Sequence, residues 1–144
     1  MLSKTKWIYI GREIKDISDI PQCCPFIVYM IYFENNEYYI GSKQIYSVTH
    51  PKISKKRANE LYSGKGRKPT REEKIKESNW KTYKSSSSIV KEMLKKYKAK
   101  FLIYDFYNTK NEMLGREAYK ILEAFLNKDE KILNEWVSIK TGRL

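Results

Sequence analysis

The longest apolar run in the chain covers residues 26–33, FIVYMIYF. Eight consecutive apolar positions rich in β-branched and aromatic residues predict a strand that is buried on both faces. The residues ENNE follow, and asparagine tolerates the positive φ angles that tight hairpins need. Residues 38–45, YYIGSKQI, then return to a strand-like pattern. Together these patterns predict a β-hairpin over residues 26–45.

Further elements are expected on both sides of this hairpin. Residues 6–14 are expected to form a short strand or arm, and residues 16–25, which contain two prolines, a connection. Downstream, a serine run that can supply an N-cap precedes apolar residues at helical spacing, Ile89, Val90, Met93, Leu94 and Tyr97. This spacing predicts a helix, and residues 101–107, FLIYDFY, predict a third strand.

The last predicted elements are helices. Residues 112–126 have an amphipathic pattern with the apolar stripe Ala118, Ile121, Leu122, Phe125 and Leu126. A weaker helical pattern continues to about residue 140. This order of elements predicts an α+β fold in which helices flank a small antiparallel three-stranded sheet. The length of 144 residues is that of one domain, 1–144.

The charge of the chain indicates its kind of partner. There are 29 Lys and Arg against 17 Asp and Glu, a formal net charge of +12. A compact protein this basic meets a polyanion, most commonly nucleic acid. A membrane span needs roughly 20 apolar residues, and no apolar run in this chain exceeds eight. Because the N-terminus also has too short an apolar stretch for a secretory signal, a cytoplasmic location is expected.

The most basic part of the chain is the segment 52–84, with 12 Lys and Arg against 4 Glu. It is expected to form a short helix near residues 55–61 and then a mobile loop around SGKGRKP. One interpretation is a solvated charged loop, and the other is a loop that tracks phosphates. For the second, the candidate nucleic-acid-binding residues in and near this segment are Lys43, Lys55, Lys56, Lys65, Arg67, Lys68, Arg71 and Lys81.

The rarer residue types narrow the chemistry. His50 is the only histidine, which excludes a site that pairs a metal-binding His with a general-base His. Cys23 and Cys24 are adjacent and have no further Cys to complete a metal site. Phosphodiester chemistry would therefore depend on carboxylates, tyrosines and cations. Glu117 is a candidate, because it lies four residues before Ile121 on the apolar side of its helix. Its carboxylate either pairs with a nearby Lys at the edge of the apolar stripe or binds a metal ion.

Four segments in the right order resemble the GIY-YIG endonuclease family, in particular the branch often carried by large phages. IVY at 27–29 is followed after nine residues by YIG at 39–41. The other three segments are SNWKTYKSSS at 78–87, NEMLGREA at 111–118 and LNEW at 133–136. The resemblance covers nearly the whole chain. A second YIG, at residues 9–11, is interpreted as a chance match, because no apolar hairpin partner precedes it.

The chain departs from the family pattern at three points. Phe26 or Ile27 replaces the glycine of the first motif, and Ser85 replaces the glycine of the serine segment. The arginine of the family has no unique counterpart. Arg57 is our choice, and Arg67 and Arg71 are its rivals.

The resemblance implies roles for individual residues in a hydrolysis that requires a divalent metal. Glu117 would bind Mg²⁺ or Mn²⁺, with water and phosphate oxygens completing the shell. Tyr29 would activate the attacking water and Tyr39 would help to orient it. Arg57 would bind the scissile phosphate through its planar guanidinium, and Lys43 would assist it. Asn134 would stabilise the arrangement of the site.

The implied substrate is DNA, with duplex DNA preferred, and specificity is expected to be modest or to come from a homodimer or a partner. If the chain is phage-encoded, its location would be the host cytoplasm. One rival hypothesis is an inactive nucleic-acid-binding protein on the same scaffold. The other is a nuclease that uses an acidic residue followed by Glu-x-Lys, with the candidates 72–74 and 129–131.

A shared site for the two tyrosines also sets the geometry of the hairpin. With a two-residue loop, strand alternation would place Tyr29 and Tyr39 on opposite faces of the sheet. A three-residue loop at 34–36 places Tyr39 across from Ile31, on the face of Tyr29. A β-bulge would have the same effect. We therefore predict an odd-residue loop or a bulge, with both hydroxyls opening on the surface that Glu117 reaches.

Overall fold

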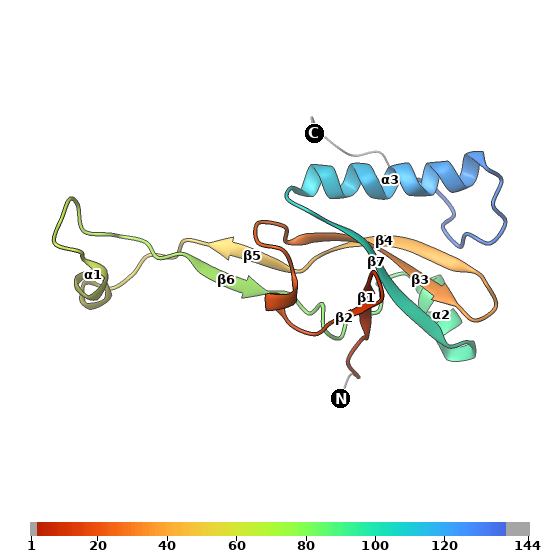
Figure 1. Ribbon diagram of the computed structural model, residues 1–144, viewed down its shortest axis with the longest axis horizontal. Helices are drawn as coiled ribbons and strands as arrows, with labels where there is room; N and C mark the ends of the chain where they lie inside the picture. The colour runs from red at the N-terminus through yellow and green to blue at the C-terminus, as the bar shows by residue number, and fades with distance from the viewer. Residues whose placement is uncertain (1–2, 138–144) are drawn as a thin grey trace. The chain divides into compact units, whose positions relative to one another are not determined.

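The computed structural model describes residues 3–137 (Figure 1). The chain divides into two compact units, a main unit of Met1–Ile45 with Asn79–Leu144, and a second unit of Tyr46–Ser78. No helix within residues 3–137 combines the length and the apolar character that crossing a membrane requires.

The main unit contains a mixed five-stranded sheet in the order β2-β1-β7-β3-β4. The strands are β1 (Trp7–Tyr9), β2 (Arg12–Ile14), β3 (Phe26–Phe33), β4 (Tyr38–Gln44) and β7 (Ala99–Tyr107). The α+β class is confirmed, but the prediction of three antiparallel strands is wrong. Ile10 and Gly11 both take positive φ angles, so the chain turns tightly and adds β1 and β2 to the sheet. β1 pairs with β7 in parallel.

The hairpin of β3 and β4 has the predicted three-residue loop. The Phe33 amide donates to the Glu37 carbonyl at 2.9 Å, which closes a loop at 34–36. Asn36 takes the left-handed φ of 70° that such a loop needs. Tyr39 pairs with Ile31, and Gly41 pairs with Tyr29. Tyr29 and Tyr39 therefore lie on the same face of the sheet, as the parity argument predicted.

Helix α3 (Lys110–Leu126) covers the other face of this hairpin, and Figure 1 shows it lying along the sheet. The core between them contains Val28, Ile40, Tyr107, Met113 and Ile121. The face of Tyr29 instead contacts the chain around residues 80–83, where the Trp7 indole donates to the Trp80 carbonyl at 2.9 Å. The main unit thus buries apolar side chains on both faces of its sheet.

The predicted apolar stripe of α3 is wrong at its far end. Leu122 and Leu126 are 37% and 73% exposed, whereas the helix buries Met113, Ala118, Ile121 and Ala124. Ala118, Ile121 and Ala124 follow one another at intervals of three along one face, and the two leucines fall beside that face. Helix α2 (Ser88–Lys96) and the short 3-10 helix η1 (Ile17–Asp19) are the other helices of this unit within residues 3–137.

The second predicted C-terminal helix is also wrong within residues 127–137, and residues 138–140 lie outside the described part. The chain reverses at Lys128, which has a φ of 53°, and then runs beside β4. The Tyr38 amide donates to the Lys131 carbonyl at 2.9 Å, and the Leu133 amide donates to the Tyr38 carbonyl at 2.7 Å. These two bonds satisfy backbone groups at the edge of the sheet that a helix would leave unpaired.

The second unit is a β-ribbon with a helix between its strands. Its elements are β5 (Tyr46–Thr49), α1 (Lys55–Leu61) and the antiparallel partner β6 (Lys74–Glu77). The predicted helix at 55–61 is confirmed, and the Ser54 hydroxyl caps it by accepting from the Arg57 amide. The ribbon was not predicted, because β6 has the sequence KIKE and all four of its residues are exposed.

Candidate active site

A hollow of about 510 Å³ lies beside β4 in the main unit. Tyr39 and Glu117 both line it, although Tyr39 belongs to the face of Tyr29 and Glu117 to the helix on the opposite face. The two faces meet here because β4 is the edge strand of the sheet. Other lining residues come from the start of α2, from the first residue of α3 and from the segment beside β4, among them Ser87, Lys110, Leu133, Asn134 and Trp136.

Glu117 is half-buried at this hollow, between apolar neighbours of its own helix. The Ser42 hydroxyl donates a hydrogen bond to its Oε2 atom at 2.5 Å. Burial raises the pKa of Glu117 above its ordinary value of 4.5, and the bond from Ser42 opposes that shift in part. The carboxylate is therefore costly to ionise and has room beside it for a positively charged partner.

Tyr39 brings its hydroxyl to the same place. Its pKa is raised, mainly by burial and then by the nearby charge of Glu117, while hydrogen bonds with Ser87 and Ser85 act in the opposite direction. A negatively charged carboxylate near a phenol disfavours the phenolate, so the phenol stays protonated to higher pH. Without a bound cation, the Tyr39 phenol is therefore a neutral hydrogen-bonding group at the hollow.

Tyr29 is buried instead, with 1% of its surface exposed. Its ring packs edge-on against Trp7 and Tyr83, at centroid distances of 5.2 Å and 6.2 Å. Its hydroxyl lies against Gly41, where a Cβ atom would overlap the phenol. The prediction that both hydroxyls open on the surface is therefore wrong for Tyr29. Tyr29 does not line the hollow, and burial raises the pKa of its phenol well above the ordinary value of 10.0.

Asn134 binds the backbone of β4. Its Oδ1 accepts from the Ile40 amide and its Nδ2 donates to the Ile40 carbonyl, both at 2.9 Å. The side chain thereby imitates one more residue of a neighbouring strand. Because Ile40 directly follows Tyr39, Asn134 fixes the part of β4 that carries the tyrosine.

The cations of the main unit that were predicted to bind nucleic acid have protein partners. The Lys43 ammonium lies 4.2 Å from the centre of the Tyr83 ring and donates to Asn79 at 2.7 Å. The Lys81 ammonium pairs with Asp16 at 3.3 Å. Lys43 follows Tyr39 and Gly41 at every second position, so it belongs to the same face of β4. Lys110 lines the hollow itself and was not among the predicted site residues.

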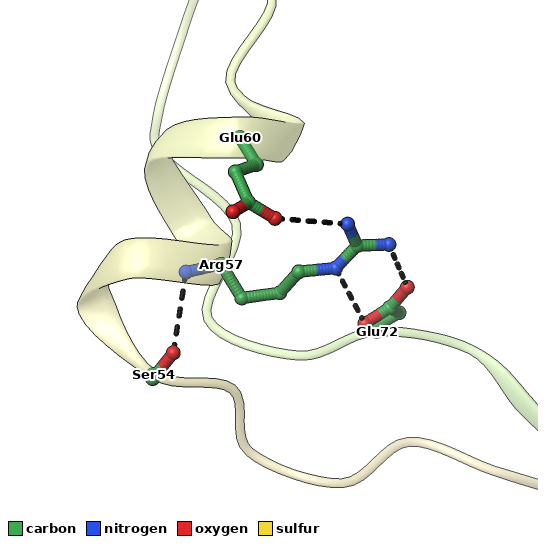
Figure 2. A network of polar contacts seen from close by, with 4 residues as sticks. All are labelled: Ser54, Arg57, Glu60 and Glu72. Atoms are coloured by element: carbon green, nitrogen blue, oxygen red, sulfur yellow. Dashed lines mark hydrogen bonds and ion pairs between the residues drawn. The ribbon is translucent and has the colours of Figure 1, made fainter.

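Arg57 lies in the second unit and is held by two carboxylates (Figure 2). Its Nη2 and Nε atoms donate to Glu72 at 2.6 Å and 3.1 Å, and its Nη1 atom donates to Glu60 at 3.1 Å. These bonds to two carboxylates raise the pKa of the Arg57 guanidinium above its ordinary value, so the group stays charged. The guanidinium is exposed, so a phosphate that replaced Glu72 would meet the same planar fork.

Four other basic residues of the second unit line a hollow of about 710 Å³, namely Lys52, Lys55, Lys68 and Arg71. Lys68 donates to Asn59 at 2.8 Å, and Arg71 donates to the His50 carbonyl at 2.8 Å. Lys56, Lys65 and Arg67 are exposed. This unit therefore presents a surface with several cations and few acidic residues.

Sequence reasoning missed the serines that contact the site. Ser42 was not singled out, and Ser85 was noted only as a departure from glycine. The structure gives Ser85 a φ of 85° and buries it. A glycine position in the resembled segment was a signal for this left-handed backbone, but nothing in the sequence indicated where the Ser85 hydroxyl would point.

The residues at the hollow offer oxygen ligands. Within residues 3–137, no group of three or more His, Cys, Asp or Glu side chains is arranged to hold a metal ion. A single carboxylate beside hydroxyl oxygens suits Mg²⁺, which keeps several waters and often takes further ligands from substrate phosphates. The donor set of Glu117, Ser42 and Tyr39 therefore fits such an ion.

Comparison with known proteins supports the family. A model of the family described as putative endonuclease segE, GIY-YIG domain, matches residues 7–137. The chain is 33% identical over 107 residues to intron-associated endonuclease 2 of Enterobacteria phage T4. That alignment covers 74% of this chain and 31% of the T4 protein. No solved structure matches. Since the family model spans nearly all of the described residues, the chain belongs to the GIY-YIG endonuclease family.

Proposed function

We propose that the chain is a metal-dependent endonuclease that hydrolyses phosphodiester bonds in DNA. The observation that carries this proposal is that Tyr39 and Glu117 line one hollow at the edge of β4. Family membership supports a nuclease, and the T4 relative is named an endonuclease. The net charge of +12 favours a polyanionic substrate.

Glu117 is the residue proposed to hold the metal. A bound Mg²⁺ or Mn²⁺ would polarise the scissile phosphate and a coordinated water. The chain contributes a carboxylate that burial makes unfavourable without a positive partner. The Ser42 hydroxyl fixes one carboxylate oxygen, and Glu117 lines the hollow in which the metal would bind.

Of the two tyrosines, Tyr39 is proposed to contact the attacking water, because its side chain reaches the hollow. Tyr29 was expected to take the water proton. Its buried side chain instead favours a packing role, because its hydroxyl lies against Gly41 on the strand that carries Tyr39. Asn134 would keep Tyr39 in place through the backbone of Ile40.

The second unit is proposed to bind the DNA backbone. It has ten Lys and Arg against four Glu between residues 46 and 78. Arg57 remains our candidate for the phosphate clamp, which requires phosphate oxygens to replace Glu72. Arg57→Ala should then slow cleavage by at least about tenfold while DNA binding weakens much less. If Arg67→Ala or Arg71→Ala shows that difference instead, the assignment of Arg57 is wrong.

A nicking assay tests the proposal. Purified protein is incubated with supercoiled plasmid in Mg²⁺, in Mn²⁺ and in EDTA. Wild-type protein should nick only with metal, and Glu117→Gln should slow nicking by on the order of a hundredfold or more. Glu123→Gln, an exposed position on the same helix, is the matched control and should behave as wild type. Binding without nicking in either metal would favour an inactive DNA-binding protein.

A further inference from the structure

Trp136 is exposed beside the candidate active site, although tryptophan is highly buried on average in folded proteins. The chain has three tryptophans. Trp7 and Trp80 are buried, with 0% and 1% of their surfaces exposed, whereas Trp136 is 72% exposed. Trp136 also lines the hollow beside β4, together with Tyr39 and Glu117. So large an apolar surface, left in water at this position, indicates a face that a ligand covers.

The segment that carries Trp136 is held against β4 by hydrogen bonds. The Leu133 amide donates to the Tyr38 carbonyl at 2.7 Å. One residue later, the Asn134 side chain makes two bonds of 2.9 Å to the backbone of Ile40. Trp136 follows Asn134 by two residues, so its indole starts from a fixed backbone position. A binding surface that is already in place loses less conformational entropy when a ligand binds.

Helix α3 supplies another wall of the same hollow. Its lining residues are spaced by three or four positions and therefore share one side of the helix, and they include Lys110, Leu114, Glu117 and Ile121. Lys110 lies seven residues before Glu117, which is about 10 Å along the helix axis. Its exposed ammonium is therefore placed to meet a phosphate that neighbours the one at Glu117.

The lining of the hollow suits a nucleotide better than an isolated phosphate. Its volume of about 510 Å³ falls in the range of sites that enclose small organic ligands. Apolar side chains such as Leu114 and Leu133 line it, and its charged lining residues are the carboxylates Glu117 and Glu135 against one lysine. Carboxylates repel a phosphate, whereas a base is neutral, flat and partly apolar. Trp136 is the aromatic partner for such a base, because every base offers a face on which an indole can stack.

We propose that Trp136 and Lys110 form a nucleotide-binding subsite of the hollow, in which Trp136 stacks on an unpaired base beside the scissile phosphate and Lys110 binds a neighbouring phosphate. This inference rests on the proposed function, in which Glu117 holds the metal at the scissile phosphate. In a duplex both faces of each base are covered by its neighbours, so an indole can stack only on a base that is unpaired or extruded. Extruding a paired base costs free energy, and an unpaired base avoids most of that cost. The protein should therefore prefer a duplex with an unpaired nucleotide over a fully paired one.

Binding in EDTA tests the subsite without cleavage. Fluorescence anisotropy compares two duplexes that differ by one bulged 2-aminopurine. The variants are Trp136→Ala, Trp136→Phe and Lys110→Gln. The control is Tyr119→Ala, which removes another exposed aromatic side chain of α3 that does not line the hollow. Two signals report stacking directly, namely the emission of 2-aminopurine and the quenching of tryptophan by acrylamide, to which Trp136 is the exposed indole.

Wild-type protein should bind the bulged duplex more tightly than the paired one. Trp136→Ala should lose affinity for the bulged duplex by on the order of tenfold, the scale of one stacked base, and bind the paired duplex as wild type does. Trp136→Phe should keep most of the preference, and Lys110→Gln should reduce the salt slope by about one. Emission from 2-aminopurine should fall when wild type binds but not when Trp136→Ala binds, and the bulged duplex should protect Trp136 from acrylamide.

Equal affinity of wild type for the two duplexes overturns the subsite, and so does a Trp136→Ala variant that keeps the preference. An indole that stays open to acrylamide in the complex has the same meaning. A purely structural role of Trp136 would weaken the binding of both duplexes alike and lower the unfolding temperature, which also overturns the inference. If wild type shows the expected binding but nicks in no metal, the proposed function fails and the subsite stands.

Discussion

Gly41 and Tyr29 lie opposite each other on the two strands of the hairpin. They are direct partners in the register, and the Tyr29 phenol occupies the space where a side chain at position 41 would begin. The glycine of the YIG segment is therefore explained by packing. A larger residue here would push the phenol away from its packed position against the Tyr83 ring.

Gly41→Ala should accordingly lower the free energy of unfolding by about 1–3 kcal/mol, the range for overpacked cores. It should also reduce cleavage more than DNA binding, because Gly41 lies two residues from Tyr39 on β4 and a displaced strand would move Tyr39 in the hollow. Chemical denaturation and single-turnover cleavage provide the two measurements. In a Tyr29→Leu background the same substitution should cost little, since the overlapping atoms are gone. An equal cost in both backgrounds would contradict this account.

Glu117 should make the free energy of unfolding decrease as pH rises. Its pKa is raised in the folded state, so the folded protein favours the protonated carboxyl. The resulting stability is fully present below the unfolded pKa, near the ordinary value of 4.5, and is lost as pH rises through the raised folded pKa.

Glu117→Gln should therefore match wild type at low pH and become the more stable protein as pH rises above about 4.5. Thermal unfolding of both proteins from pH 4 to 8 checks this. At neutral pH, Mg²⁺ should raise the unfolding temperature of wild type but not that of the variant, because ligand binding stabilises the folded state. If the wild type is more stable than Glu117→Gln at pH 8 without metal, the claim that the Glu117 carboxylate lacks a compensating partner is wrong.

At the scale of elements, the hairpin shows what the sequence can determine. An apolar run, an Asn-containing turn and the requirement that Tyr29 and Tyr39 share a face predicted either an odd-residue loop or a bulge, and the structure has the three-residue loop. Helix α1 was likewise predictable, because Ser54 caps it and Gly64 follows its end. In these cases the local signals and the tertiary structure agree.

The elements that sequence reasoning missed are those that depend on distant partners. β1 and β2 have only three residues each, and β1 becomes a strand by pairing with β7. Residues 127–137 have a helical pattern, but backbone bonds to Tyr38 hold part of them beside β4. Tyr29 was assigned to an open surface because sequence spacing fixes its face and not its depth. The partners that bury it, Trp7 and Tyr83, lie far away in the sequence.

The segment beside β4 leads to a prediction for the edge of the sheet. Asn134→Ala removes two hydrogen bonds to Ile40, which should lower the free energy of unfolding by about 1–3 kcal/mol. Amide exchange at Ile40 should become faster, and cleavage should decrease because β4 carries Tyr39. Asn127→Ala, at the exposed end of α3, is the control. Unchanged exchange at Ile40 would show that Asn134 does not hold the strand.

At the scale of the whole molecule, positive charge is unevenly distributed. Residues 46–78 are less than a quarter of the chain but contain 10 of its 29 Lys and Arg. The basic segment was recognised from its composition, although its ribbon was not. Its exposed cations include Lys56, Lys65 and Arg67. Because these side chains do not pack in the core, they can be replaced without disturbing it.

If this unit binds the DNA backbone, affinity should fall steeply with salt, because each neutralised phosphate releases condensed counterions. Replacing Lys56, Lys65 and Arg67 by Gln should reduce the slope of log K against log salt by roughly one for each phosphate that is no longer neutralised. The control replaces Lys96, Lys98 and Lys100, exposed residues of the main unit, and changes the net charge equally. Fluorescence anisotropy with a duplex between about 50 and 300 mM salt measures both slopes. Equal reductions would mean that total charge and not the second unit determines binding, and a slope near zero would exclude the DNA backbone as the ligand.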